Sequence, residues 1–433
     1  MPPTKREPAA AAEHAGKPSR RRLLARVPWW PIVLSLIVIL TAAGARRPVR
    51  DAGTLADVSE AYLVKSSGYV ALGPLSAVLD TIALISARQH IAMLAGLLAL
   101  LALYQATRHV RGRATWRSHF VALAWFLAVF IVSYVAAVIL PRPMAYLASR
   151  EPNIMRVDFH SHTSASRDAR RGFGVEDNRN WHRRAGYDVA FITDHGTVAG
   201  AERGLANNTP SGLDEPVLLQ SIEVTWTGEH VSIPGAQRTY TGVLTENLRD
   251  VDPQALRLAS LVAAREPIVV WHHPRDLNRL PPAAGPRTAG IRAIEIANGS
   301  PDNMDDVEPK RAQIVAFAQR HDFALTTGTD NHGWGYTAPA WTLMRLPTWR
   351  GLGGDELTLL IERVIRELGF GGTLAIERVV EYPENGAELA LTVVTVPLMM
   401  FRTLATDERM MWLLWIWAVW GIIRWATQRR ARA

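Results

Sequence analysis

The amino-acid sequence predicts an α/β fold with a parallel sheet, flanked on both sides by membrane-spanning helices. Two observations lead to this prediction. In the middle of the chain, short apolar runs typical of strands alternate with amphipathic or polar stretches, the pattern of strand–helix–strand units. On either side lie longer apolar runs, and a bilayer span needs roughly 20 apolar residues. We therefore expect one polar α/β domain held by a membrane anchor.

Four segments follow one another along the chain. Residues 1–26 are rich in Ala, Pro and charge, and we expect a disordered basic tail there. Region 27–145 is expected to contain three or four transmembrane helices, and region 386–428 one or two more. Region 151–385 has the composition of a soluble domain. The apolar runs that predict the first group of helices are residues 27–45, 69–86, 91–107 and 120–140.

The excess of basic residues favours a membrane protein over a nucleic-acid-binding protein. The net charge is +8, much of it beside the apolar runs, and no basic run is interleaved with aromatic residues. We expect three spans before residue 150 and one after the domain, in an inner membrane of the bacterial type. This arrangement places the basic N-terminus, the basic loop at 108–117 and the basic C-terminus in the cytoplasm, and the domain outside the cytoplasm. Four spans would place the domain inside. Arg46, Arg47 and Arg50 fit neither arrangement.

Within the soluble segment, periodicity predicts individual elements. Amphipathic patterns predict helices over 175–185 and 308–321, the second with apolar residues at Ile314, Phe317 and Ala318. The runs that predict strands are residues 189–192, 217–219, 268–271, 291–296 and 323–325. The run that precedes His160 predicts one more strand. A parallel arrangement would bring the carboxyl ends of these strands to one edge.

Side chains that can bind metal ions follow five of these strands. His160 and His162 are two residues apart, so they point to the same face of a strand and can hold one ion together. The chain has no cysteine, which excludes thiolate zinc sites and leaves nitrogen and oxygen ligands. The other candidates at or near strand ends are Asp194, His195, Glu223, His230, His272, His273, Asp330 and His332, with Asp168 in the loop after His162.

Taken as a set, these motifs resemble the polymerase and histidinol phosphatase (PHP) superfamily of metal-dependent phosphoesterases. The resemblance covers about residues 154–335 and rests on HxH, Thr-Asp-His, the strand-end Glu, His-Pro and the final DxH. It implies a distorted (β/α)7 barrel with two or three divalent ions, Zn, Mn, Fe or Mg. It also implies nine ligands in three groups: His160, His162, Glu223 and Asp330; Glu223, His230 and His273; Asp168, His195 and His332.

These residues predict hydrolysis of a phosphate ester. A divalent ion lowers the pKa of a bound water from about 16 to about 7, which makes it nucleophilic at neutral pH. Glu223 is expected to bridge two ions and take part in catalysis, and Asp194 to orient a ligand. Arg275, next to His273-Pro274, is the preferred phosphate clamp. Further candidates for that role are Arg171, Arg183 and Arg184.

The expected partners are the lipid bilayer and a small phosphorylated substrate, with nucleic acid as a narrower alternative. Two further functions stay open. One is a metal-binding sensor or scaffold without turnover, and the other is a metal-dependent hydrolase of carboxylic or carbamate esters, since the same activated water attacks carbonyl groups. The sequence does not fix the identity of the metal or the oligomeric state.

Overall fold

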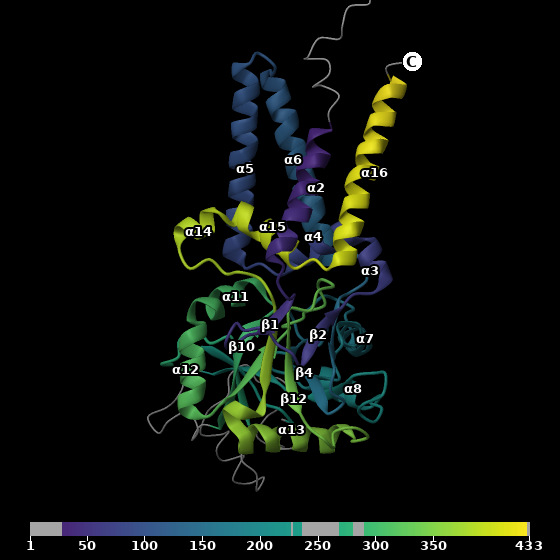
Figure 1. The fold of residues 1–433 in the computed structure, drawn as a ribbon. Coiled ribbons are helices and arrows are strands. Elements are labelled where there is room, and N and C mark those ends of the chain that lie inside the picture. The colour runs from purple at the N-terminus through teal and green to yellow at the C-terminus, as the bar shows by residue number, and fades with distance from the viewer. Residues whose placement is uncertain (1–27, 227, 236–267, 280–289, 431–433) are drawn as a thin grey trace, which may run out of the picture.

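The protein folds into a mixed α/β domain from which long helices extend. The computed structural model describes residues 28–226, 228–235, 268–279 and 290–430, so the expected tail at 1–26 lies outside it. Figure 1 shows the domain at one end and the long helices running away from it. Shorter helices lie between the two parts. The domain and the helical region are thus distinct in space, as their compositions predict.

A six-stranded sheet forms one half of the domain. Strands β4, β5 and β6 on one side of the sheet are parallel, whereas β12 pairs with β4 in the antiparallel direction and β13 pairs with β12 and β1 in the same way. In spatial order the strands are β1 (Val49–Asp51), β13 (Leu374–Arg378), β12 (Ala340–Arg345), β4 (Ile154–Ser161), β5 (Val189–Ile192) and β6 (Val217–Gln220).

A five-stranded sheet forms the other half. Strands β9, β10 and β11 are parallel, and β7 and β8 form an antiparallel hairpin at the edge. Their order is β11 (Ala324–Gly328), β10 (Ile291–Asn298), β9 (Val269–His272), β8 (Glu229–Ser232) and β7 (Glu223–Trp226). A smaller pair, β2 (Ala61–Val64) and β3 (Tyr146–Ser149), completes the described strands.

The closed (β/α)7 barrel that the resemblance implied is not confirmed. Within the described ranges, the strands form separate sheets instead of one continuous ring. Two single backbone bridges connect the halves, Ser161 with Asn331 and His195 with Glu223. Because single bridges replace full ladders at these seams, the ring stays open, yet the carboxyl ends of β4, β5 and β11 still meet.

Helices cover the sheets where the sequence predicted them. Helix α7 spans Val175–Ala185, and Gly186 at φ +83° ends it in the left-handed conformation that glycine tolerates. The second predicted helix is divided into a 3-10 turn, η3 (Glu308–Lys310), and α12 (Arg311–His321). Among the described residues, the other helices of the domain are α8 (Ala199–Leu205), α11 (Pro301–Val307), α13 (Gly354–Leu368) and the 3-10 turn η4 (Gly369–Gly372).

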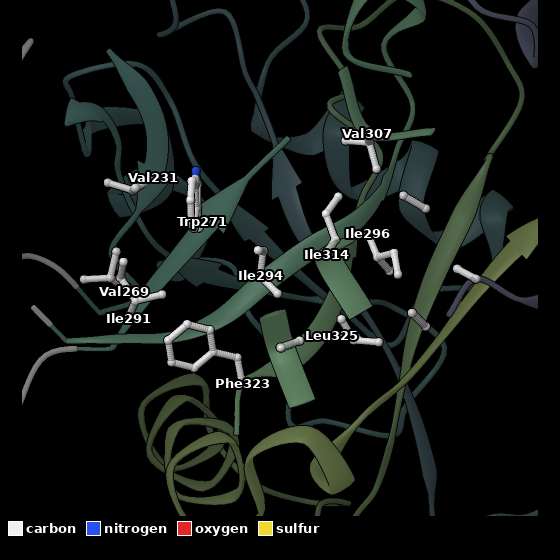
Figure 2. Close-up of a cluster of buried hydrophobic side chains, with 14 of the residues drawn as sticks. Val231, Val269, Trp271, Ile291, Ile294, Ile296, Val307, Ile314, Phe323 and Leu325 are labelled. Atoms are coloured by element: carbon white, nitrogen blue, oxygen red, sulfur yellow. The ribbon is translucent and has the colours of Figure 1, made fainter. Parts of the chain in front are cut away.

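The core of the second sheet is apolar and closely packed. Figure 2 shows Trp271 of β9, Ile294 of β10 and Phe323, which directly precedes β11, with Ile314 of α12 in the same cluster. All four side chains are buried. Burial of such side chains contributes about 1.5–3 kcal/mol each, so this cluster provides a rigid base for the polar residues at the strand ends.

Three helices of the other region are long and apolar enough to cross a membrane. They are α5 (Ala87–Val110), α6 (Trp116–Ile139) and α16 (Thr406–Arg430). The first apolar run forms a shorter helix, α2 (Trp29–Leu40), continued by the 3-10 turn η1 (Thr41–Gly44). Short helices account for the other apolar runs: α3 (Ser67–Ala71), α4 (Gly73–Ala83), α14 (Gly386–Ala390) and α15 (Thr392–Arg402).

Residues 49–64 differ from the sequence-based division. They belong to the segment assigned to membrane helices, yet β1 pairs with β13 and β2 with β3, so this stretch is part of the α/β domain. The chain thus leaves the first apolar helix, adds an edge strand to the domain, and then returns to the helical region. This excursion was not evident from hydropathy because a three-residue edge strand has no periodicity to detect.

The carboxyl ends of the parallel strands face the long helices. The loop between β11 and β12 reaches α6, where the Gly335 N–H donates to the Val138 carbonyl at 2.8 Å. Helix α11 follows β10 and touches the start of α5, where the Arg88 N–H donates to the Asp305 carboxylate at 2.9 Å. Helix α13 follows β12 at the opposite end (Figure 1).

Candidate metal centre

The two histidines of the HxH motif lie at the end of β4 and are both buried. Their Nε2 atoms point at the same two carboxylates. Those of His160 and His162 lie 3.0 and 3.3 Å from Glu223 Oε2, and 3.4 and 3.2 Å from Asp330 Oδ1. Four residues from three strand ends therefore converge, and His160, His162 and Asp330 are close enough to hold one ion.

Glu223 also belongs to a second group of possible ligands. Its other oxygen, Oε1, lies 2.5 Å from Nδ1 of His230, and Oε2 lies 3.5 Å from Nδ1 of His195. The His273 ring stands 4.8 Å from the His230 ring. A carboxylate with two oxygens that face different groups of imidazoles is suited to bridging two cations.

The third expected group is also assembled. The Asp168 carboxylate lies 3.1 Å from Nε2 of His195 and 3.3 Å from Nε2 of His332. His162, His195 and His332 together could hold an ion. About half of the Asp168 side chain is exposed, and those of His195 and His332 are partly exposed. This group therefore forms the open side of the centre, whereas the HxH side is closed.

Glu295 and His272 join the buried side of the centre. Glu295 was not identified from the sequence, and His272 was assigned to none of the three ligand groups. Glu295 in β10 is fully buried, and its Oε1 lies 3.3 Å from Nδ1 of His160 and 3.5 Å from Nδ1 of His272. Its Oε2 accepts the backbone N–H of His273 at 2.8 Å. The signal in the sequence was an acidic residue inside an otherwise apolar strand, because a buried charge requires a partner.

The backbone at two of the candidate ligands is strained. His273 has φ +24° and Asp330 has φ +50°, values that residues with a side chain rarely adopt. Such conformations cost on the order of 1–3 kcal/mol and persist where surrounding contacts impose them. Here the Glu295 carboxylate holds the His273 N–H, and the His160 carbonyl accepts the N–H of Asp330 at 2.8 Å. Both contacts direct these side chains into the centre.

Asp194 supports the loop after the HxH motif. One carboxylate oxygen accepts the Thr163 N–H at 2.6 Å, and the other accepts the Thr163 hydroxyl at 2.7 Å. Burial raises the pKa of this carboxyl group. Both oxygens thus contact one residue of the loop that follows His162, and the orienting role of Asp194 stays a prediction.

The charges of the centre compensate one another. Burial opposes a positive charge on His160, but the carboxylates of Asp330 and Glu223 outweigh it and raise the pKa of this imidazole well above its ordinary value. Burial would raise the pKa of Glu223, yet His160 and its neighbours lower it well below its usual range. In the metal-free state the carboxylates thus keep their charge by holding protons on adjacent imidazoles.

The residues present fit divalent cations. Nδ1 of His162, Nε2 of His272 and Nδ1 of His273 are buried without a hydrogen-bond partner among the described residues. Buried polar atoms are seldom left unpaired, so these nitrogens are in place for ligation. Burial lowers the pKa of His273 to about 4, so its imidazole is neutral at physiological pH, the form that binds metal. The donor set contains only nitrogen and oxygen.

The candidate arginines lie outside this cluster. The Arg275 guanidinium pairs with Asp306 of α11 at 3.2 Å, and its backbone N–H donates to Glu229. Arg184 lies over the Tyr336 ring, Arg183 donates to Asn180, and Arg171 is exposed. A further arginine, Arg170, lies beside the open group, because its backbone N–H donates to the His332 carbonyl at 2.8 Å.

Comparison with known proteins adds distant likenesses of fold. No family model and no curated protein matches the sequence. Among solved structures, PsfC from Pseudomonas syringae aligns at 15% identity and a TM-score of 0.38, over 57% of this chain and 98% of PsfC. Endonuclease Q bound to a duplex with an abasic lesion aligns at 11% identity and a TM-score of 0.34, over 50% of this chain and 57% of its own.

A proposed metal-dependent phosphoesterase from Bifidobacterium adolescentis aligns at 18% identity and a TM-score of 0.29, over 46% of this chain and 90% of its own. All of these TM-scores are low. The functional conclusion therefore rests on the geometry of the site.

Proposed function

We propose that this protein is a membrane-anchored, metal-dependent hydrolase of the PHP type that cleaves a phosphate ester with two or three bound divalent ions. The observation that carries the proposal is the convergence of nine dispersed side chains, of which Glu223 is the carboxylate shared between groups. Divalent ions held there would supply a nucleophilic water and neutralise charge on the phosphoryl group. The nine proposed ligands are His160, His162, Asp168, His195, Glu223, His230, His273, Asp330 and His332.

Individual residues of the chain would have separate roles in binding and orienting the ions and the substrate. Glu223 faces two groups of imidazoles and would fix the spacing between two ions. Asp194 would hold the loop of His162, and Glu295 would orient His160 through its Nδ1. The half-exposed Asp168 marks the side on which a substrate enters.

For the membrane part, we propose the spans α2, α5, α6 and α16, three before the domain and one after it. The turn between α5 and α6 and the end of α16 lie at the end of the molecule away from the domain, and the start of α2 is directed toward that end (Figure 1). That end carries the basic residues Arg108, Arg111, Arg113, Arg117, Arg429 and Arg430. The tendency of such residues to stay in the cytoplasm would place the domain on the opposite side.

The three arginines that opposed this arrangement are now accounted for. Arg50 pairs with Glu377 at 2.7 Å, Arg46 with Glu381 at 3.1 Å, and Arg47 with Asp57 at 3.7 Å. Each lies on the domain side with a carboxylate beside it. Their charge is locally offset, which supports their place outside the cytoplasm.

The orientation can be tested directly because the chain has no cysteine. Single Arg350→Cys and Arg113→Cys variants would each carry one reactive thiol. A membrane-impermeant maleimide added to intact spheroplasts should label the first variant and leave the second unlabelled until the membrane is permeabilised. Labelling of Arg113→Cys alone would contradict the proposed orientation.

The activity is tested on the full-length protein in detergent, loaded with Mn or Zn. Release of p-nitrophenol from p-nitrophenyl phosphate and from bis-p-nitrophenyl phosphate should depend on the metal and stop when a chelator is added. A metal-loaded protein that hydrolyses neither ester would favour the sensor or scaffold. Turnover of carboxylic or carbamate esters in place of phosphates would favour the alternative hydrolase.

A further inference from the structure

The open side of the metal centre lies close to the level at which α6 ends. His332, a proposed ligand, is followed two residues later by Trp334, and then by Gly335, whose N–H binds the Val138 carbonyl in the last turn of α6. Only a short segment therefore separates a metal ligand from the end of a membrane span. If α6 crosses the bilayer, Trp334 lies at the boundary between lipid and water.

The rim residues have the chemistry of that boundary. Trp334 is 48% exposed, and the Arg170 guanidinium lies 5.9 Å from the centre of its ring. A second pair stands beside it, with Arg184 5.2 Å from the centre of the Tyr336 ring. Tryptophan and tyrosine are enriched at membrane interfaces, where arginine also meets lipid phosphates.

The contacts of Arg170 tie the rim to the metal centre. Its backbone N–H donates to the carbonyl of His332, while its guanidinium lies near two rings, 5.7 Å from the centre of Phe173 and 5.9 Å from that of Trp334. The Asp168 carboxylate, two residues earlier, is half exposed and contacts both His195 and His332. A guanidinium two residues from an exposed ligand is placed to bind the oxygens of a phosphate that reaches the ions.

We propose that the phosphate ester cleaved at this centre belongs to a membrane lipid, whose headgroup reaches Asp168 and His332 from the bilayer surface past Arg170 and Trp334. This rests on the proposed hydrolase function and on the proposed spans. Hydrolysis forms a P–O bond from water, breaks the ester P–O bond, and passes the proton of the water to the alcohol that leaves.

The membrane-distal end of the domain offers a matched control for the rim. Arg350 also lies over a tryptophan, 4.4 Å from the centre of the Trp349 ring, but it follows the far end of β12. Arg170 and Arg350 thus make the same kind of contact at opposite ends of the domain. A property that depends on the bilayer should distinguish them.

The position of the rim is measured without reference to activity. A Trp334→Cys or Arg350→Cys variant, labelled with a polarity-sensitive fluorophore and placed in nanodiscs, reports the environment of each end. We expect blue-shifted emission and quenching by brominated lipids at position 334 only. Equal, water-like emission at both positions would overturn the proposal. Thermal unfolding of each labelled protein confirms that it is folded.

The substrate class is tested by two arms with the full-length, metal-loaded protein. In one arm the substrate is dioleoyl phosphatidic acid or phosphatidylglycerol in mixed micelles. In the other arm it is the soluble ester glycerol 3-phosphate or p-nitrophenyl phosphate. We expect the lipids to be cleaved at least about tenfold faster at equal concentration, and the rate to fall as detergent dilutes the lipid in the micelle surface.

Variants of the rim complete the test. Arg170→Ala, and the milder Arg170→Lys, should lower lipid turnover by roughly tenfold or more, as loss of a charged hydrogen bond does. Turnover of p-nitrophenyl phosphate should fall by a smaller factor, because a soluble ester does not have to pass the rim. Arg350→Ala should change neither. Equal turnover of soluble and lipid esters, unaffected by Arg170, would refute the lipid substrate and leave the hydrolase standing. No turnover of any phosphate ester would refute both.

Discussion

The molecule contains two clusters of buried carboxylates, the candidate metal centre and the cluster around Asp80 in α4. The two clusters differ in the side chains with which their carboxylates pair. In the metal centre, Glu223 and Asp330 face imidazoles. Asp80 instead binds Arg142 at 3.1 Å and Arg378 at 2.6 Å, with further hydrogen bonds from Tyr69 and Thr337. Both clusters are buried in the folded chain.

The difference lies in the partners. An imidazole can release its proton at neutral pH and offer a lone pair, so a metal ion can take the place of the proton. A guanidinium stays charged and offers no lone pair. The Asp80 cluster is therefore closed to metals and connects α4 with the loop before β12 and with β13, which fixes the helical region to the domain. Burial of a carboxylate alone does not indicate a metal site.

The largest effect is expected from Glu223→Gln, which keeps the shape of the side chain and removes its charge. The variant should lose bound metal and lose more activity than the roughly 10–100-fold that removal of an outer partner costs. Metal analysis and the phosphoesterase assay measure both. Glu377→Gln, a buried glutamate that pairs with Arg50 and Arg311, is the control and should keep its metal. Full metal content in Glu223→Gln would contradict the bridging role.

Asp80→Asn should produce the converse result. It leaves Arg142 and Arg378 buried without their carboxylate, which typically costs about 3–5 kcal/mol of folding free energy. Chemical denaturation of the purified protein in detergent measures the loss. The folded fraction of Asp80→Asn should bind as much metal per molecule as the wild type. Loss of metal with unchanged stability would show that the two clusters are not separate.

The stability of the metal-free protein should depend on pH in a way that the Asp80 cluster does not produce. The pKa of His160 is raised above its ordinary value of 6.5, so the stability from its protonated form is complete below that value and lost as pH rises through the raised pKa. The pKa values of Glu223 and Asp330 are lowered, so their contribution is complete above their ordinary values of 4.5 and 3.8 and lost on further acidification.

The pKa values of His162 and His332 are raised as well and act in the same direction as that of His160, whereas the lowered pKa values of His272 and His273 act in the opposite direction. Because the three raised values outweigh the two lowered ones, we expect the metal-free protein to unfold at a lower temperature at pH 8 than at pH 6. Bound Zn should remove this difference, because the cation replaces the proton at any pH at which it stays bound. Thermal unfolding at both pH values, with and without Zn, provides the measurement. A metal-free protein with a higher unfolding temperature at pH 8 than at pH 6 would contradict this prediction.

The smallest effect is expected from Arg275→Ala. The sequence suggested this residue as a phosphate clamp, but its guanidinium pairs with Asp306 on a half-exposed surface, and exposed pairs contribute about 0–1 kcal/mol. We expect activity to fall by less than about threefold, within the effect of one such contact. Arg171→Ala, at an exposed position beside the open group, is the comparison. A tenfold or greater loss of activity in Arg275→Ala would instead support a role for Arg275 in binding the phosphate.

Parts of the site were readable from the sequence because local rules place them. The HxH spacing puts His160 and His162 on one face of a strand, and strand ends of a parallel sheet meet at one edge. Helix α7 was predicted with its bounds from its amphipathic pattern, which is a local property of the sequence. Glu295 was overlooked because its strand was judged by its apolar residues alone.

Other features could not be read in this way. The division of the strands into two sheets depends on hydrogen bonds between segments far apart in the chain, as at the seam between Ser161 and Asn331. The role of Asp80 depends on Arg142 and Arg378, of which the second lies nearly 300 positions away. Neither pairing has a local pattern, and both arise from packing.

The sequence by itself determined which side chains are available for ligation, and that they follow apolar strands between two apolar regions. Only the tertiary structure decided which carboxylates meet imidazoles and which meet arginines, and that the open side of the centre faces the long helices. The physical reason is that side-chain chemistry and periodicity are local properties, whereas the partner of a buried charge is fixed by contacts between distant segments.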